Sequence, residues 1–358
     1  MSVGWAHGNF AALPSVVLVE IYEYLSFRDK LKASSTCRAW RDCLFHPRFW
    51  TTLTIRLGRK RNAWRQAEFL AKKCGRFVRH FTLEFDCTSP QIVQQCIAVL
   101  ALLGENRQLT SLCLRPTACV VAWPHRLYDA PNVQAMKAKP SLSTTDDQQT
   151  VCEGSWLELS RRCPKLRVTI ALLHTCEPWS AIKGLLNAAI PLAKFQSYFS
   201  DGFRSDVLDL LSAQYAETLE AVTVVSALSG IEGIPQRTFA VRAESPVVML
   251  AWRCHRLRSL KLVGHEIADF DLIAVARLRG PQLKELVIPA DCVSGSSIGG
   301  PYYSELRLAD VEHLETEVSL SLQRTWTLTN RQSPAQNEMG EIRSYMRSIQ
   351  ELQSYTSL

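Results

Sequence analysis

The sequence lacks the segments that cross or target a membrane. No run approaches the roughly 18 consecutive apolar residues that a membrane-spanning helix requires. The first ten residues have neither the basic start nor the apolar stretch of a secretory signal peptide. We therefore expect no membrane span. We also expect the 12 cysteines to be free thiols in a reducing compartment, the cytoplasm or the nucleus.

Patterns typical of metal, cofactor and catalytic sites are also missing. There is no Cys-x-x-Cys or His-x-x-His pair and no glycine-rich phosphate loop of the required spacing. Gly295–Gly299 matches the Gly-x-Ser-x-Gly pattern of hydrolases, with Asp310 and His313 following it. That pattern needs a helix directly after the serine turn, and Gly300-Pro301 prevents one. We predict no catalytic residue, no cofactor and no metal.

The charge is concentrated in one segment. The 358 residues are 47% hydrophobic and 21% charged, proportions typical of a folded protein, and the net charge is +7. Residues 56–79 hold nine basic residues and one acidic residue, a net charge of +8, so the remainder of the chain is close to neutral. We expect this segment to face an acidic partner. Its basic residues are Arg56, Arg59, Lys60, Arg61, Arg65, Lys72, Lys73, Arg76 and Arg79.

A short apolar pattern, Leu-x-x-Leu-x-Leu or a close variant, recurs along the chain. Its copies begin at Val78, Leu109, Leu192, Leu219, Leu257 and Leu283, with a less regular copy at Leu166. Three of the steps between copies are 26 or 27 residues, a spacing found in leucine-rich repeats. Segments with helical apolar spacing precede several copies, at 90–103, 204–215, 247–253 and 270–278. Each unit therefore contains one helix and one strand, which bury their apolar faces only against neighbouring units.

These features predict an α/β protein in which an N-terminal helical unit precedes an irregular leucine-rich-repeat solenoid. The solenoid is expected at 64–320, after a basic linker at 53–63 and with a loop insertion at 115–150. The proline-punctuated loop 115–150 and the Gly/Ser-rich loop 291–304 are candidate target-binding loops. The remaining 321–358 form a tail with helical apolar spacing at 341–352, which suits a closing helix or a solvated extension equally well.

Residues 10–52 form a different unit with three expected helices. Pro14, Leu18, Ile21 and Leu25 form one apolar stripe on the first helix, and Asp29 and Thr36 are expected to cap the second and third. Three helices of about 40 residues bury little surface. The apolar side chains are therefore expected to dock in a partner's groove or to cap the solenoid.

This unit resembles the F-box family. The matching positions are Leu13, Pro14, Ile21, Leu25, Asp29, Leu31, Cys37, Arg38, Trp40 and Trp50. Val16 departs from the pattern, because many members have an acidic residue there. Downstream, segments 69–79, 248–254 and 272–280 also resemble a member of this family.

The resemblance implies a non-catalytic substrate-recognition subunit of an SCF-type cullin-RING ubiquitin ligase. Such a subunit docks on the Skp adaptor, and through it on the cullin and RING subunits, while its other domain holds a protein target for ubiquitylation and proteasomal degradation. The resemblance assigns the adaptor contact to Leu13, Pro14, Leu18, Ile21, Leu25, Leu31, Cys37, Trp40 and Leu44. We expect Trp40 to be its anchor, because buried aromatic side chains dominate interface energies. Trp50 suits an alternative role, packing against the solenoid.

Two other functions remain open from the sequence. One is a non-catalytic scaffold that acts outside a ligase, which no residue pattern separates from a ligase receptor. The other is a nucleic-acid-binding repeat protein that uses the basic segment 56–79, where Trp64 and Phe77 lie among the cations. Clustered charge gives affinity for phosphates without selecting bases, so it favours this second function less.

Overall fold

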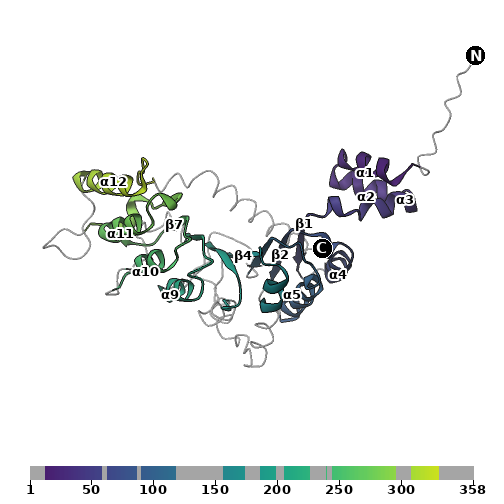
Figure 1. The fold of residues 1–358 in the computed structure, drawn as a ribbon, viewed down its shortest axis with the longest axis horizontal. Helices are drawn as coiled ribbons and strands as arrows, with labels where there is room; N and C mark the ends of the chain where they lie inside the picture. The colour runs from purple at the N-terminus through teal and green to yellow at the C-terminus, as the bar shows by residue number, and fades with distance from the viewer. Residues whose placement is uncertain are drawn as a thin grey trace, which may run out of the picture.

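The structure is a computed structural model of the chain. It describes residues 13–58, 63–86, 90–117, 156–173, 186–198, 205–225, 239, 244–295 and 308–329. Three short helices at the N-terminus lead into a long parallel sheet (Figure 1). The mixture of helices and strands confirms the α/β prediction.

The N-terminal helices are α1 (Ser15–Glu23), α2 (Phe27–Ser34) and α3 (Arg38–Leu44), followed by a 3₁₀ turn at Pro47–Phe49. Ser26 caps α2, because its hydroxyl accepts a hydrogen bond from the Asp29 amide and donates one to the Asp29 carboxylate. The expected cap Asp29 thus lies inside the helix. Thr36 does not cap α3 either: its hydroxyl donates to the Ala33 carbonyl at the end of α2, and Cys37 precedes α3.

Aromatic residues fill the centre of this helical unit. Tyr22 is fully buried, and its hydroxyl donates a hydrogen bond to the Trp40 carbonyl over 2.7 Å. Its ring centroid lies 5.7 Å from those of both Trp40 and Phe49. Trp50 is buried after the third helix, where its indole N–H donates to the Leu44 carbonyl at 2.7 Å. These contacts tie α1 and α3 to the turn that leads into the first strand.

Among the described residues, the main sheet has eight parallel strands that neighbour one another in chain order. They are β1 (Thr52–Leu57), β2 (His80–Asp86), β3 (Ser111–Thr117), β4 (Arg167–Leu173), β5 (Leu192–Tyr198), β6 (Ala221–Val225), β7 (Ser259–Val263) and β9 (Glu285–Val287). Parallel neighbours require a crossover connection, usually a helix. A second small sheet pairs β8 (Ile267–Ala268) with β10 (Val293–Ser294).

A helix precedes most of these strands. The helices are α4 (Ala63–Cys74), α5 (Pro90–Leu103), α9 (Ser205–Gln214), α10 (Pro246–Arg253) and α11 (Asp269–Arg279), and residues 156–162 are also helical. Figure 1 shows α4, α5, α9 and α10 along one face of the sheet. All copies of the predicted Leu-x-x-Leu-x-Leu pattern lead into strands. Their first residues, such as Leu109, Leu219 and Leu257, are buried.

The sheet begins earlier than the sequence predicts. Residues 53–63 were expected to be a linker, but β1 at Thr52–Leu57 pairs in parallel with β2. Its alternating residues Leu53, Ile55 and Leu57 are buried in the core. The alternation places one face of β1 against α4 and α5. The helical unit is therefore joined directly to the first strand.

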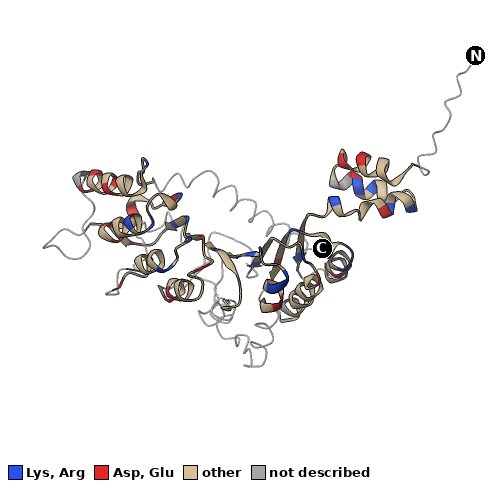
Figure 2. Ribbon diagram, in the orientation of Figure 1, with Lys and Arg blue, Asp and Glu red and all other residues tan. Residues whose placement is uncertain are grey.

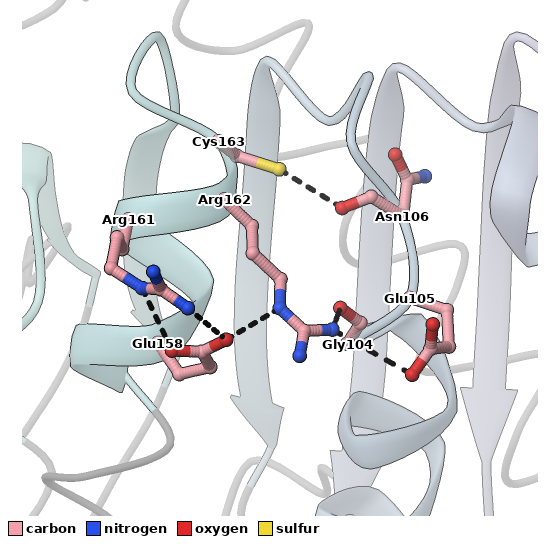
Figure 3. A network of polar contacts seen from close by, with 7 residues as sticks. All are labelled: Gly104, Glu105, Asn106, Glu158, Arg161, Arg162 and Cys163. Carbon is pink, nitrogen blue, oxygen red and sulfur yellow. Dashed lines mark hydrogen bonds and ion pairs between the residues drawn. The ribbon is translucent and has the colours of Figure 1, made fainter.

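Polar contacts connect several of the turns that lead into the strands. The buried Asn106 side chain donates to the carbonyls of Gly75 and Val78, in the preceding turn, at 2.6 and 2.7 Å. The Cys163 thiol then donates to the Asn106 carbonyl at 3.1 Å (Figure 3). Further along, the Tyr215 hydroxyl donates to the carbonyl of Asn187. Neighbouring units are thus held together by buried hydrogen bonds as well as by strand pairing.

An ion-pair network covers the Asn106 turn on its outer side (Figure 3). Arg162 donates to the Gly104 carbonyl at 2.6 Å and pairs with Glu158 at 2.6 Å. Hydrogen bonds from Arg161 and then Arg162 lower the pKa of Glu158 to about 2. The network joins helix 156–162 to the turn that precedes β3.

The last unit is closed by α12 (Leu308–Leu322) and the chain that follows it. Trp326 is buried, and its indole N–H donates to the Leu286 carbonyl at 2.8 Å. Thr329 bridges to Pro289 beside the end of β9, donating to the Ile288 carbonyl and accepting from the Ala290 amide. Residues 321–329 therefore belong to the fold rather than to the expected tail, and 341–352 lie outside the described residues. This contact covers the end of the edge strand.

We expect Trp326→Phe to lower the free energy of unfolding by about 1 kcal/mol, because the variant loses one buried hydrogen bond but keeps an aromatic ring. Ending the chain after Leu322 should cost more, since it also removes the Thr329 pairing. Thermal unfolding of both variants measures this, with the exposed Thr327→Ala as control. Equal stability of the wild type and the shortened chain would show that 323–329 contribute nothing to the cap.

Candidate interaction surfaces

The N-terminal helices expose large apolar side chains. Val16 is 72% exposed, Tyr24 is 87% exposed, and Leu31 on α2 is 46% exposed. Val17 is also exposed, and Ile21 is half-buried one turn further along α1. Val17, Ile21 and Tyr24 follow at steps of four and three residues and so form one face of α1. A small helical unit that leaves such a face uncovered has a surface suited to a partner.

The residues predicted to contact the adaptor divide into surface and interior positions. Pro14 and Leu31 are exposed. Leu18 and Leu44 are 1% and 6% exposed, so they pack inside the helical unit and offer almost no surface to a partner. The half-buried positions are Leu13, Ile21, Leu25, Cys37 and Trp40.

Val16, Val17 and Tyr24 were not predicted from the sequence as surface residues. The spacing of Pro14, Leu18, Ile21 and Leu25 predicted a single apolar stripe, whereas α1 has two. Leu18 and Tyr22, four residues apart, face inward, while Val17, Ile21 and Tyr24 lie on the other stripe. Helical spacing separates these two sets, but the packing of α3 against α1 decides which of them faces inward.

The helical unit also contacts the first helix of the sheet region. The Phe45 ring at the end of α3 meets the Phe69 ring of α4 edge-on, with centroids 5.7 Å apart. Phe45 also stacks on the buried Trp50 at 6.3 Å. Trp50 therefore packs in the core between the helices and β1, which fits the structural role considered for it. Phe69 is nevertheless about half exposed, so the junction retains apolar surface.

The basic segment 56–79 is divided among several environments. Arg65, Lys73, Arg76 and Arg79 are exposed along α4 and the turn that follows it, and the Arg76 guanidinium lies 4.5 Å from the centroid of the Phe77 ring. Lys72 is also exposed but pairs with Glu68 over 2.7 Å. Figure 2 shows basic residues on α4, whereas acidic residues gather on α12. Arg59, Lys60 and Arg61 lie outside the described residues.

Arg56 is not an available member of this basic surface. It pairs at 2.8 Å with Glu84 on β2, and Arg115 on β3 pairs with the same carboxylate at 3.0 Å. The strand register places the three residues side by side. Glu84 is only 2% exposed, so two guanidinium groups compensate one buried charge.

Replacing Glu84 with glutamine should lower the free energy of unfolding by about 1–2 kcal/mol, because two charge-assisted hydrogen bonds weaken while both arginines remain. The cost is moderate since Arg56 and Arg115 are partly exposed and can regain water. Chemical denaturation measures the change, and the more exposed Glu285→Gln is the matched control. A Glu84→Gln protein as stable as the wild type would show that this buried pairing makes no net contribution.

Other candidate features of the sequence fall partly outside the structure. β3 extends to Thr117, so residues 115–117 of the predicted insertion belong to a strand and 118–150 lie outside the described residues. Within the loop predicted at 291–304, residues 293–294 form β10, and 296–304 are not described. Of the Gly-x-Ser-x-Gly pattern only Gly295 is described, while Asp310 and His313 are exposed on α12.

The cysteines at the helix-to-strand turns are buried thiols. Cys74 and Cys254 are fully buried, and burial raises the pKa of each to about 12. Cys163 is also buried, and burial raises its pKa. Among the described residues no group of three or more His, Cys, Asp or Glu could hold a metal ion. In the same part of the chain, no helix is long and apolar enough to cross a membrane.

Comparisons with known proteins agree with the N-terminal geometry. The family described as F-box-like matches residues 10–56, a range that includes α1, α2, α3 and most of β1. F-box only protein 33 of Mus musculus is 22% identical over 475 aligned residues, which cover 88% of this chain and 82% of the relative. F-box only protein 33 of Homo sapiens is 22% identical over 470 aligned residues with the same coverage. The chain therefore contains an F-box-like unit and is similar to F-box only protein 33 over most of its length.

Proposed function

We propose that the chain is the substrate-recognition subunit of an SCF-type cullin-RING ubiquitin ligase. F-box proteins are generally non-catalytic substrate receptors, and the F-box-like match at 10–56 supports an adaptor role at that level. The apolar face left open on α1 and α2 is the observation that carries the proposal. The Skp adaptor would cover this face and connect the chain to the cullin and RING subunits.

The proposed contribution to ubiquitylation is proximity. A tethered target has a high effective concentration of its lysines near the charged ubiquitin-conjugating enzyme, so no side chain of this chain needs to make or break a bond. The ubiquitylated target would then be degraded by the proteasome. This function places the chain in the cytoplasm or the nucleus.

The exposed and half-buried members of the predicted set would form the adaptor contact. Pro14, Leu31 and the half-buried Trp40 would bury apolar surface, with Trp40 as anchor because large aromatic side chains dominate interface energies. We add Val17 and Tyr24, which share the open face of α1. Leu18 and Leu44 would support this surface from inside.

The sheet region would hold the target, and we propose that it is an irregular leucine-rich-repeat solenoid. Parallel strands in chain order, with a helix before most of them, are the arrangement expected of stacked helix–strand units. Such arrays bind through one extended face or through loops on one rim, so the loops predicted from the sequence at 115–150 and 291–304 are candidates.

The basic residues of α4 would bind an acidic partner beside the adaptor. Arg65, Lys73, Arg76 and Arg79 remain exposed there, and Arg76 stays available above the Phe77 ring. Nucleic acid is the alternative that these cations favour. A titration against generic DNA and RNA at low salt separates the two, because a nucleic-acid protein must bind there and weaken steeply as salt rises.

Co-purification tests the proposed function. The wild-type chain should recover the adaptor, the cullin and the RING subunit, whereas Leu13→Ala combined with Pro14→Ala should lose all three and keep a folded sheet region. Arg65→Ala combined with Lys73→Ala is the matched control and should retain them. Recovery of the adaptor at the wild-type level by the Leu13/Pro14 variant would refute the docking assignment. Binding of the adaptor without the cullin would favour the scaffold alternative.

A further inference from the structure

Cations that form no ion pair among the described residues gather where α10 runs into β7. Arg253 ends α10, and Arg256 and Arg258 follow in the turn before β7; all three are exposed. Lys284 is exposed immediately before β9. We call Trp252, Arg253, Arg256, Arg258, Arg279 and Lys284 the α10–β7 patch.

The fold brings these residues together from two neighbouring units. Ser259 pairs with Glu285, so the residues just before them, Arg258 and Lys284, lie on adjacent strands about 4.8 Å apart. Arg279, at the end of α11, donates to the Cys254 carbonyl at 3.4 Å and so lies between Arg253 and Arg256. The patch is therefore continuous along the amino-terminal edge of the sheet.

The positive charge of the patch is not balanced within the described chain. None of its five cations forms an ion pair with a described carboxylate. The carboxylates on neighbouring strands form ion pairs with other cations instead. Glu220 pairs with Arg167, and Glu285 pairs with Lys261. Among the described residues the buried Nε of Arg279 has no hydrogen-bond partner, and burial lowers the pKa of this arginine. A bound anion would relieve this desolvated and uncompensated charge.

An exposed aromatic side chain borders the cations. Trp252 is 57% exposed and lies two residues before Cys254. Leu278 is partly exposed at the matching place on α11, two residues before Gly280. The patch therefore offers apolar contact area next to its arginines, a combination enriched at protein interfaces.

We infer that the α10–β7 patch binds an acidic peptide segment of a partner protein, with an apolar side chain of that segment on Trp252. The inference rests on the proposed function and states the chemistry of the target. Carboxylates fit better than one phosphate because the cations follow an edge instead of converging on a point. Single-stranded nucleic acid fits less well, because stacking successive bases takes several aromatic platforms and this patch has one.

Fluorescence anisotropy with the full chain tests the inference. The probe is a labelled peptide of alternating Glu and Asp with one central Leu. Comparison probes are the same peptide with Gln and Asn, a neutral peptide with one phosphoserine, and a single-stranded oligouridine. Arg256→Glu combined with Arg258→Glu should weaken binding of the acidic probe at least about tenfold, and Trp252→Ala should weaken it only when the central Leu is present.

Arg107→Glu combined with Lys165→Glu is the matched control, since both cations are exposed in the turns before β3 and β4, and should bind the acidic probe as the wild type does. Equal binding of the acidic and neutral probes, unchanged binding by the Arg256/Arg258 variant, or tighter binding of the phosphopeptide or oligouridine would overturn the inference. Adaptor binding by the same variant is measured in parallel. Its retention separates failure of this patch from failure of the proposed function.

Discussion

Replacing Asn106 with alanine is expected to lower the free energy of unfolding by about 3 kcal/mol. The fully buried side chain donates to the carbonyls of Gly75 and Val78 and accepts from the Gln108 amide at 2.6 Å. Each lost hydrogen bond costs about 1 kcal/mol net, and buried carbonyls left without a donor add to the cost. The loss should be visible in chemical denaturation as a lower midpoint.

Two further variants test whether the hydrogen bonds of Asn106 cause this loss of stability. Asn106→Asp keeps the acceptor for Gln108 but places a carboxylate against two carbonyl oxygens, so it should be at least as destabilising as alanine. Asn187→Ala is the matched control, because that side chain is half-buried and accepts one bond, from the Ala189 amide. It should cost about 1 kcal/mol or less. If Asn106→Ala and Asn187→Ala lose equal stability, the inter-unit contacts of Asn106 are not what holds this turn.

Tyr22→Ala is expected to destabilise the helical unit by about 3–5 kcal/mol, the cost of removing a buried aromatic side chain. The ring contacts Trp40 and Phe49, and its hydroxyl donates to the Trp40 carbonyl. Burial raises the pKa of this phenol to about 12, so it stays a protonated donor at neutral pH. Because a unit of about 40 residues has little stability to lose, we expect it to unfold and to release the adaptor.

Tyr22→Phe keeps the ring and removes only the hydroxyl, so it should cost about 1 kcal/mol and leave the adaptor bound. Limited proteolysis reports the state of the helices, and a pull-down reports adaptor binding. A Tyr22→Ala chain whose N-terminal helices resist protease as the wild type does would contradict the packing described for this unit.

Local periodicity predicted most elements of the sheet. The Leu-x-x-Leu-x-Leu copies mark strands because their apolar residues are buried within single units, as Leu109 and Leu112 are before and within β3. β1 was missed because Thr52–Leu57 has no repeat helix before it, although Leu53, Ile55 and Leu57 alternate as a half-buried strand does.

The sequence pattern could not predict contacts between residues that lie far apart in the chain. Arg56 was counted among the free cations because its partner Glu84 is 28 residues away and meets it only through the register of two strands. The cap at Trp326 likewise depends on a contact with Leu286, 40 residues earlier. For α1, the helical period was recognised correctly, but assigning residues to inner and outer stripes required the packing of α3 against it.

Titration of the full chain with purified Skp adaptor tests the central claim most directly. The wild type should bind, and Val17→Glu combined with Leu31→Glu should weaken binding at least about a hundredfold, because both exposed apolar contacts would become charged. Both side chains are exposed, so circular dichroism should show an unchanged fold. Leu157→Glu, on the exposed face of helix 156–162, is the matched control and should bind as the wild type does. Wild-type affinity in the Val17/Leu31 variant, or no binding by the wild type, would contradict adaptor docking through this F-box surface.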